Sequence, residues 1–250
     1  MSYAAALEAT GRQAGLRRSE RTRLAILAAT ARLLGRMSPA ALTISAVAAE
    51  AGVAHGTVYL HARDGRALLE ATAEGFAHFI RDHLAAVRDG AAGEPVRVLA
   101  TTRRYVALFR ENSGLMRCLT QAGESGAAES GAAESEAAES EAGEKGAGET
   151  SAGGFRATFH ALNRDWNGRA AHAIQRRRRA AGRSDDPDDA LQTAYALGGM
   201  VDEFLAQLYL RRDPALAAVA SDEEAVARLL TRLWLAGADA DADAYPMARE

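Results

Sequence analysis

The side chains that could carry out nucleophilic, acid–base or metal chemistry are few and poorly grouped. His55 and His61 are six residues apart, about 240° around a helix, so their rings would not converge on one metal ion. The single cysteine, Cys118, has no base that the sequence places beside it. The acidic pairs at 185–186 and 188–189 lie at a predicted helix start, where the backbone stabilises negative charge. We therefore expect no catalytic residue, no metal site, no cofactor and no enzymatic activity.

A different chemistry is available to the stretch AGVAHGTVYLHARDG, residues 51–65. His55 and Tyr59 are four residues apart, as are Thr57 and His61, so each pair would share one face of a helix. Such a polar, uncharged face suits hydrogen bonds to base edges and to phosphates. The stretch therefore indicates a helix that lies against DNA.

Two short helices would position this face. Thr43 is a good N-cap for a helix over 44–50, and Gly52 ends that helix. A second helix follows over about 54–60, and Gly56 within it is a poor helix former that allows close approach to a partner. Two helices joined by a tight glycine turn form a helix-turn-helix, whose second helix lies in the DNA major groove.

The other segments also carry the periodicity of helices, and we find no strand pattern bounded by hairpin turns. Asp64, Asp186 and Ser221 are the predicted caps of three of these helices. The further predicted helices cover residues 20–36, 65–88, 95–111, 115–121, 155–181, 187–211 and 221–236. The predicted fold class is all-α, with about nine helices.

Charge is distributed unevenly along the chain. The formal net charge is −3, but residues 122–154 hold eight glutamates and one lysine, and residues 11–36 hold seven arginines and one glutamate. The acidic segment has no large apolar residue and repeats a glutamate every five residues, so we expect a disordered Ala/Gly/Ser/Glu insert. The basic end favours nucleic acid as a partner.

The composition and the apolar runs of the sequence also bear on where in the cell the protein is expected. Of the 250 residues 48% are hydrophobic, which is enough for a substantial core. No apolar run approaches the about 20 residues of a membrane span, and the first residues do not resemble a signal peptide. One cysteine fits a reducing compartment. We therefore expect a cytoplasmic protein with no membrane partner.

The segment TISAVAAEAGVAHGTVYLHARDGRALL, residues 43–69, resembles the DNA-binding signature of TetR-family transcriptional regulators. The shared features are a threonine that opens the second helix, an Ala-Gly-Val turn, a Gly-Thr-aliphatic-Tyr recognition helix and an aliphatic pair in the next helix. The preceding RTRLAILAATARLL resembles the first helix of the family.

Three positions depart from the family pattern. Ala54 stands where a serine would cap the recognition helix, and Ala62 stands where an aromatic would fill the core. Gly65 lies near the place of a lysine that contacts phosphate, for which Arg63 or Arg66 could substitute.

The resemblance implies a homodimer that binds a palindromic double-stranded DNA operator. We expect a ligand-responsive regulator, a repressor that a small hydrophobic effector releases. The alternative is an all-α small-molecule-binding or sequestering protein with weak or lost DNA binding, and a third, weaker possibility is an all-α enzyme. The expected organisation is a flexible basic arm (1–18), a helix-turn-helix domain (19–65), a ligand-binding and dimerisation domain (66–236) and a flexible tail (237–250).

The resemblance also implies site residues. The implied DNA-binding residues are Thr43, His55, Gly56, Thr57, Tyr59, His61, Arg63, Arg66 and Arg23, with Arg12, Arg17, Arg18 and Arg21 in the arm. The candidate effector-pocket residues are Phe76, Phe79, Tyr105, Phe109, Met116, Phe159, Leu162 and Trp166. The candidate dimer-interface residues are Leu191, Gly198, Val201, Leu205, Leu208, Leu229 and Leu233. The arginine run at 176–179 is expected to be a solvated helix end.

Overall fold

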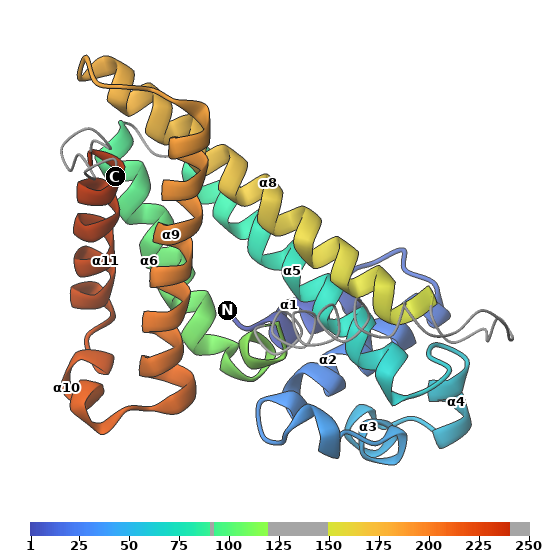
Figure 1. The fold of residues 1–250 in the computed structure, drawn as a ribbon. Coiled ribbons are helices and arrows are strands. Elements are labelled where there is room, and N and C mark those ends of the chain that lie inside the picture. The colour runs from blue at the N-terminus through green and yellow to red at the C-terminus, as the bar shows by residue number, and fades with distance from the viewer. Residues whose placement is uncertain (91–92, 120–149, 241–250) are drawn as a thin grey trace, which may run out of the picture. The chain divides into compact units, whose positions relative to one another are not determined.

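The protein is described by a computed structural model that covers residues 1–90, 93–119 and 150–240. Within these ranges the regular elements are all helical and no strand forms (Figure 1). The predicted all-α fold class is therefore confirmed.

The chain divides into two compact units. Unit 1 consists of Met1–Ile80 and Arg110–His160, and unit 2 consists of Arg81–Phe109 and Ala161–Glu250. The helix-turn-helix lies in unit 1, and the helices of the candidate dimer face lie in unit 2.

Unit 1 begins with the helices that carry the candidate DNA-binding face. They are α1 (Tyr3–Gly11), α2 (Arg18–Leu34), the 3₁₀ turn η1 (Pro39–Ala41), α3 (Ile44–Ala51), α4 (His55–Tyr59) and α5 (Gly65–Gly90), whose first part belongs to this unit. Residues 113–119 add a further helical segment. The predicted helices 20–36, 44–50, 54–60 and 65–88 thus form within a few residues of their expected ends.

A small apolar core joins α2, α3 and α4. Ile26 of α2, Val47 of α3 and Val58 of α4 are fully buried in one cluster, together with Leu68 at the start of α5. Ala62, which stands where the family pattern has an aromatic, is also buried in this cluster. Burial of these side chains fixes the angle between α3 and α4, because apolar surface is removed from water only when the helices cross.

Helix α1 is a departure from the expected flexible arm over residues 1–18. Tyr3 is buried, with its ring centroid 5.6 Å from that of Phe76 and 5.3 Å from that of Phe79. A Cβ at Gly75 would collide with the Tyr3 phenol oxygen, so any larger residue there would require Tyr3 to shift. The sequence of this helix, YAAALEATG, has no clear apolar stripe, so only these contacts in the folded chain reveal it.

Unit 2 contains the long helices of the C-terminal part. They are α6 (Glu94–Glu111, largely in this unit), α8 (Thr150–Ala180, from Ala161 onward in this unit), α9 (Pro187–Ala206), the π-helical turn η2 (Gln207–Arg211), the 3₁₀ turn η3 (Pro214–Leu216), α10 (Ala217–Ala220) and α11 (Glu223–Ala238). Helix α11 packs along α9, and α10 lies near one end of this pair (Figure 1). Alanines of α8, α9 and α11, together with Ile174 and Leu197, form their common core.

The arginine run at 176–179 is not simply a solvated helix end. The side chain of Arg178 is only 3% exposed, and its guanidinium pairs with Asp189. It also donates to the carbonyl of Ala238 over 3.1 Å and to the hydroxyl of Thr193 over 3.2 Å. Since a buried charge is costly unless it is paired, these contacts explain why an arginine is tolerated inside unit 2.

Boundaries in the C-terminal half also differ from the sequence expectation. Asp222, rather than Ser221, caps α11, because its carboxylate accepts the N–H of Ala225 over 2.9 Å. Most of the expected insert 122–154 lies outside the described residues, and the helix α8 already begins at Thr150. The tail 237–250 likewise lies mostly outside them, and its first residues belong to α11.

Candidate nucleic-acid interface

Helix α3 is held at both ends by the residues expected to do so. The Thr43 hydroxyl accepts the N–H of Ala46 over 3.2 Å, and the threonine backbone is extended as an N-cap requires. Gly52 ends the helix in the left-handed region with φ of 67°, and the N–H of Val53 returns to the carbonyl of Ala48 over 3.0 Å. This pair of caps sets where the chain turns toward α4.

Helix α4 buries one side and exposes the other. Val58 and Ala62 face the core, whereas His55, Gly56 and Tyr59 are exposed. The imidazole of His55 and the phenol of Tyr59 lie edge to face with centroids 5.2 Å apart, as their four-residue spacing predicts. The side predicted to contact DNA is therefore presented to solvent, with the two rings already in mutual contact.

The opposite flank of the exposed side carries Thr57 and His61, both half-buried. Ala54, the residue just before α4, provides no side-chain hydrogen bond to cap the helix, as an alanine predicts. The backbone at Ala54 is nevertheless extended, with φ of −64° and ψ of 145°, which is the conformation of a capping residue.

An ion-pair network holds α2 against α3. Arg32 donates to a Glu50 carboxylate oxygen over 2.6 Å, and Arg36 donates to the other oxygen over 2.6 Å. Arg32 also pairs with Glu8 of α1. The bonds from Arg32 and then Arg36 hold the pKa of Glu50 below its ordinary value of 4.5. The network keeps α3, and through it the turn to α4, in a fixed position on α2.

The arginines expected to contact phosphate are exposed. Arg63 lies 3.4 Å from Asp64, and Arg66 lies 3.1 Å from Glu70. Such surface pairs contribute little, so they can be exchanged for a phosphate at small cost. Arg23 is exposed on α2, and Arg17 pairs with Glu20 over 2.9 Å.

Sequence reasoning missed one residue of this surface. Leu60, which follows the last residue of α4, is 82% exposed, and Tyr59 beside it is 51% exposed. From sequence alone, a leucine next to a helix is expected in the core. The structure shows that Val58 and Ala62 are buried, whereas Leu60 points outward.

The candidate effector residues are divided between the two units. Phe76, Phe79 and Met116 lie in unit 1, where the two phenylalanines pack around Tyr3 and Met116 is buried. Those two rings are thus engaged in docking α1, a contact that the sequence did not indicate.

The other effector candidates belong to unit 2 or lie outside the description. The rings of Tyr105 and Phe109 meet edge to face with centroids 6.2 Å apart, and Tyr209 lies 6.3 Å from Phe109. The Tyr105 hydroxyl donates to Asp202 over 2.6 Å, and burial together with this carboxylate raises the pKa of Tyr105. Trp166 is half-buried on α8. The side chains of Phe159 and Leu162 lie outside the described residues.

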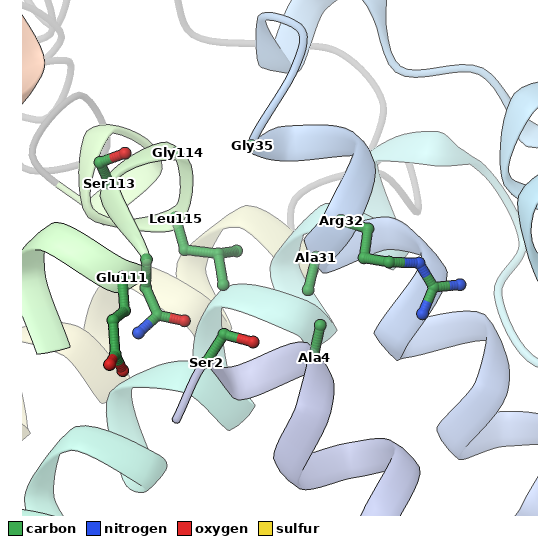
Figure 2. A pocket seen from close by; sticks show the side chains of 10 residues that line it. Ser2, Ala4, Ala31, Arg32, Gly35, Glu111, Ser113, Gly114 and Leu115 are labelled. Atoms are coloured by element: carbon green, nitrogen blue, oxygen red, sulfur yellow. The ribbon is translucent and has the colours of Figure 1, made fainter.

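A cavity in unit 1 is lined by other residues than those expected for an effector. Its volume is about 270 Å³, and it lies among the start of α1, the end of α2 and the turn at 111–115. Figure 2 shows Glu111 and Ser113 at this turn, with the Arg32 guanidinium pointing away from them. The cavity combines small apolar side chains with polar ones, unlike the aromatic pocket that the sequence suggested.

The candidate dimer-face residues have different exposures. Leu191 and Leu233 are both 40% exposed, on α9 and α11. Val201 and Leu229 are half-buried, and a Cβ at Gly198 would face Asn167 of the same subunit. Leu205 and Leu208 are buried inside unit 2, so their side chains are not available to a second subunit, which corrects their assignment to the dimer face.

Two apolar side chains that were not expected at this face are exposed beside it. Tyr195 is 41% exposed and Met200 is 36% exposed, both on α9. Gly199 lies between them in sequence, and a Cβ there would meet open space.

The capped helix α3, the glycine turn and the outward polar side of α4 define a helix-turn-helix DNA-binding protein. Residues 26–72 match the family model described as bacterial regulatory proteins, tetR family. The match covers the DNA-binding part of the chain, and it agrees with the resemblance of residues 43–69 to the DNA-binding signature of TetR-family regulators. The matched model describes regulatory proteins, in agreement with the expected DNA-binding regulator.

Solved structures share the fold over nearly the whole chain. A transcriptional regulator from Pseudomonas aeruginosa PAO1 is 16% identical with a TM-score of 0.64, over 91% of this chain and 94% of that one. A TetR-like regulator from Rhodococcus sp. RHA1 is 14% identical with a TM-score of 0.61, over 89% and 97%. The fatty acid degradation regulator FadR from Bacillus halodurans is 12% identical with a TM-score of 0.58, over 86% and 94%. At these identities the comparison shows the shared fold.

The search of curated proteins gave no match to the sequence. In the part of the chain that the structure describes, no helix combines the length and the apolar character needed to cross a membrane.

Proposed function

We propose that the protein is a ligand-responsive repressor that binds a palindromic operator as a homodimer. The observation that carries the proposal is the exposed side of α4, where His55, Gly56 and Tyr59 face solvent while Val58 is fully buried. A short helix anchored by one buried residue, with polar side chains outward, is suited to enter the major groove. In this proposal His55, Gly56 and Thr57 face bases, and Thr43, Tyr59 and His61 contact phosphates.

The exposed apolar residues of α9 and α11 support a homodimer. Leu191 and Tyr195 are one helical turn apart on α9, and Leu233 lies on α11, which packs along α9. Exposed apolar groups on two adjacent helices favour burial against the same helices of a second copy. A twofold axis there would present two α4 helices, one to each half of a palindrome.

Release by an effector would be a shift between two conformations. A small molecule lowers the population that binds DNA only if it binds the other conformation more tightly. The ring cluster of Tyr105, Phe109 and Tyr209 in unit 2 supports an apolar or aromatic effector, and Tyr105 with its partner Asp202 adds a polar anchor.

The salt dependence of DNA binding tests the proposal. Binding to duplex DNA from upstream of the coding region is measured across a series of salt concentrations, for the wild type and for Tyr59→Ala. We expect affinity to fall steeply as salt rises, because phosphate contacts release counterions. Tyr59→Ala is expected to weaken binding by about 1–3 kcal/mol.

Val96→Ala is a matched control for that substitution. Val96 is also exposed and apolar but lies on α6 in unit 2, so its truncation should leave DNA affinity unchanged. An unchanged affinity for Tyr59→Ala, in a variant that unfolds at the wild-type temperature, would contradict the proposal.

The alternative is a small-molecule-binding protein that has lost useful DNA affinity. The observation in its favour is Ala54, which leaves α4 without a side-chain cap. This alternative predicts no binding even at low salt, whereas the repressor predicts its strongest binding there.

A further inference from the structure

The exposed side of α4 has an apolar centre. Val58 and Ala62 face the core, and Leu60 is two residues from each of them. Two residues correspond to about 200° around a helix, so Leu60 points almost directly away from the core. The backbone at Leu60 is still helical, with φ of −70° and ψ of −16°, so this geometry continues through it.

Gly56 lies on the same line, four residues before Leu60. A Cβ at Gly56 would meet open space, so the glycine is not required by packing inside the subunit. The middle of the face therefore consists of bare backbone at Gly56 and an isobutyl side chain at Leu60. The polar pairs, His55 with Tyr59 and Thr57 with His61, stand on its two sides.

Contacts within the subunit do not account for the position of Leu60. It is 82% exposed, which is the highest value among the large hydrophobic side chains that the structure shows as exposed. A solvent-exposed aliphatic side chain stabilises the protein only when a partner buries it. In a helix that enters the major groove, the residue opposite the core is the one nearest to the base edges.

A leucine has no donor or acceptor, so it can distinguish bases only by apolar contact. In the major groove the apolar feature of the standard bases is the 5-methyl group of thymine, while the other groups on the base edges are donors or acceptors. We propose that Leu60 packs against a thymine methyl group in each half of the operator and thereby selects thymine at that position. The proposal rests on the proposed function, since it requires α4 to lie in the major groove.

Replacing thymine by deoxyuridine tests this contact directly. Duplexes are first selected from a random library with the wild-type protein, and each thymine of the enriched half-site is then replaced in turn. Deoxyuridine keeps the base pair and the O4 acceptor and removes only the methyl group. For one thymine we expect the Kd of the wild type to rise about fourfold per half-site, the value for one buried methyl-sized group.

The Leu60→Ala variant shows whether Leu60 makes the contact. It should bind the thymine operator more weakly than the wild type does, and it should bind the thymine and deoxyuridine operators almost equally. Because Leu60 is exposed, this variant should fold normally, and its thermal unfolding is checked. Val96→Ala is the control and should keep the full response to deoxyuridine.

Three results would overturn the proposal. The wild type could be insensitive to every replacement, or Leu60→Ala could lose as much affinity as the wild type on the same replacement. Either result, with operator binding intact, would refute the contact between Leu60 and thymine without contradicting the repressor proposal. Failure of the folded wild type to enrich any sequence would refute the repressor proposal and this contact with it.

Discussion

At the scale of single residues, we expect the substitution Gly56→Ala to affect stability and DNA affinity differently. Its Cβ position is open, so Gly56→Ala should not disturb packing. Alanine favours a helix over glycine by about 1 kcal/mol, so we expect the variant to be at least as stable as the wild type. We also expect it to bind DNA more weakly, because the added methyl group holds the backbone away from the bases.

Thermal unfolding and DNA titration of the same Gly56→Ala preparation check both expectations. Equal or tighter DNA binding would show that close approach of the α4 backbone is not the reason for this glycine. A lower unfolding temperature would show that the glycine has a role inside unit 1.

Some single-residue assignments could not be made from the sequence, because core and interface use the same residue types. Leu205 and Leu191 have the same side chain on the same helix, yet Leu205 is fully buried and Leu191 is 40% exposed. Arg178 looks like its arginine neighbours in the sequence, but only the folded chain brings Asp189 and Thr193 to it. The polar face of α4, in contrast, was predictable, since its four-residue spacing is local.

At the scale of elements, helix α4 begins without a side-chain cap. Ala54 has the extended backbone of an N-cap but no side-chain oxygen to accept a backbone N–H. We expect Ala54→Ser to raise the free energy of unfolding of unit 1 by about 0.5–2 kcal/mol, the usual value of such a cap. A better ordered α4 should also bind DNA more tightly.

Urea unfolding and DNA titration of Ala54→Ser measure the two effects, with Ala54→Val as the control that adds volume without a capping oxygen. A serine variant no more stable than the valine variant would mean that the backbone of α4 is already fixed by its core contacts.

The packing of α3 on α2 should depend on pH through Glu50. Its pKa is lowered in the folded chain by Arg32 and then Arg36. Such a carboxyl stabilises the fold above its unfolded-state pKa, near 4.5, and this contribution is lost as the pH falls through the lowered folded value. We expect Glu50→Gln to be less stable than the wild type at pH 7, with the difference shrinking below about pH 4.5.

Urea unfolding of both proteins at a series of pH values gives this difference. A gap between wild type and Glu50→Gln that stays constant down to pH 3 would contradict an ion-pair role for Glu50.

The elements themselves were predictable to different degrees. Thr43, Gly52 and Asp64 mark helix ends through local hydrogen bonds, and the structure shows each of them. Helix α1 was missed because its docking depends on Phe76 and Phe79, more than seventy residues from Tyr3. Local patterns reveal caps and amphipathic stripes, whereas contacts between distant segments require the folded chain.

At the scale of the whole molecule, the proposed repressor needs two copies of α4. We expect the double variant Leu191→Glu/Leu233→Glu to be monomeric, since a charge on each of two exposed apolar positions opposes burial. Loss of the second binding site should weaken operator binding by about a hundredfold or more.

Light scattering gives the oligomeric state, and titration of the operator gives the affinity. The control is Val96→Glu, which places a charge at an exposed apolar position of α6. A double variant that remains dimeric would place the interface on other helices.

The most direct measurement of the central claim compares two selections from one random DNA library, with the wild type and with Thr57→Ala. If α4 contacts bases from two symmetric subunits, the wild type should enrich an inverted repeat. Thr57→Ala should then lose the base preference at the same position of both half-sites. Enrichment of no repeat by the wild type, or of an identical sequence by both proteins, would contradict the account.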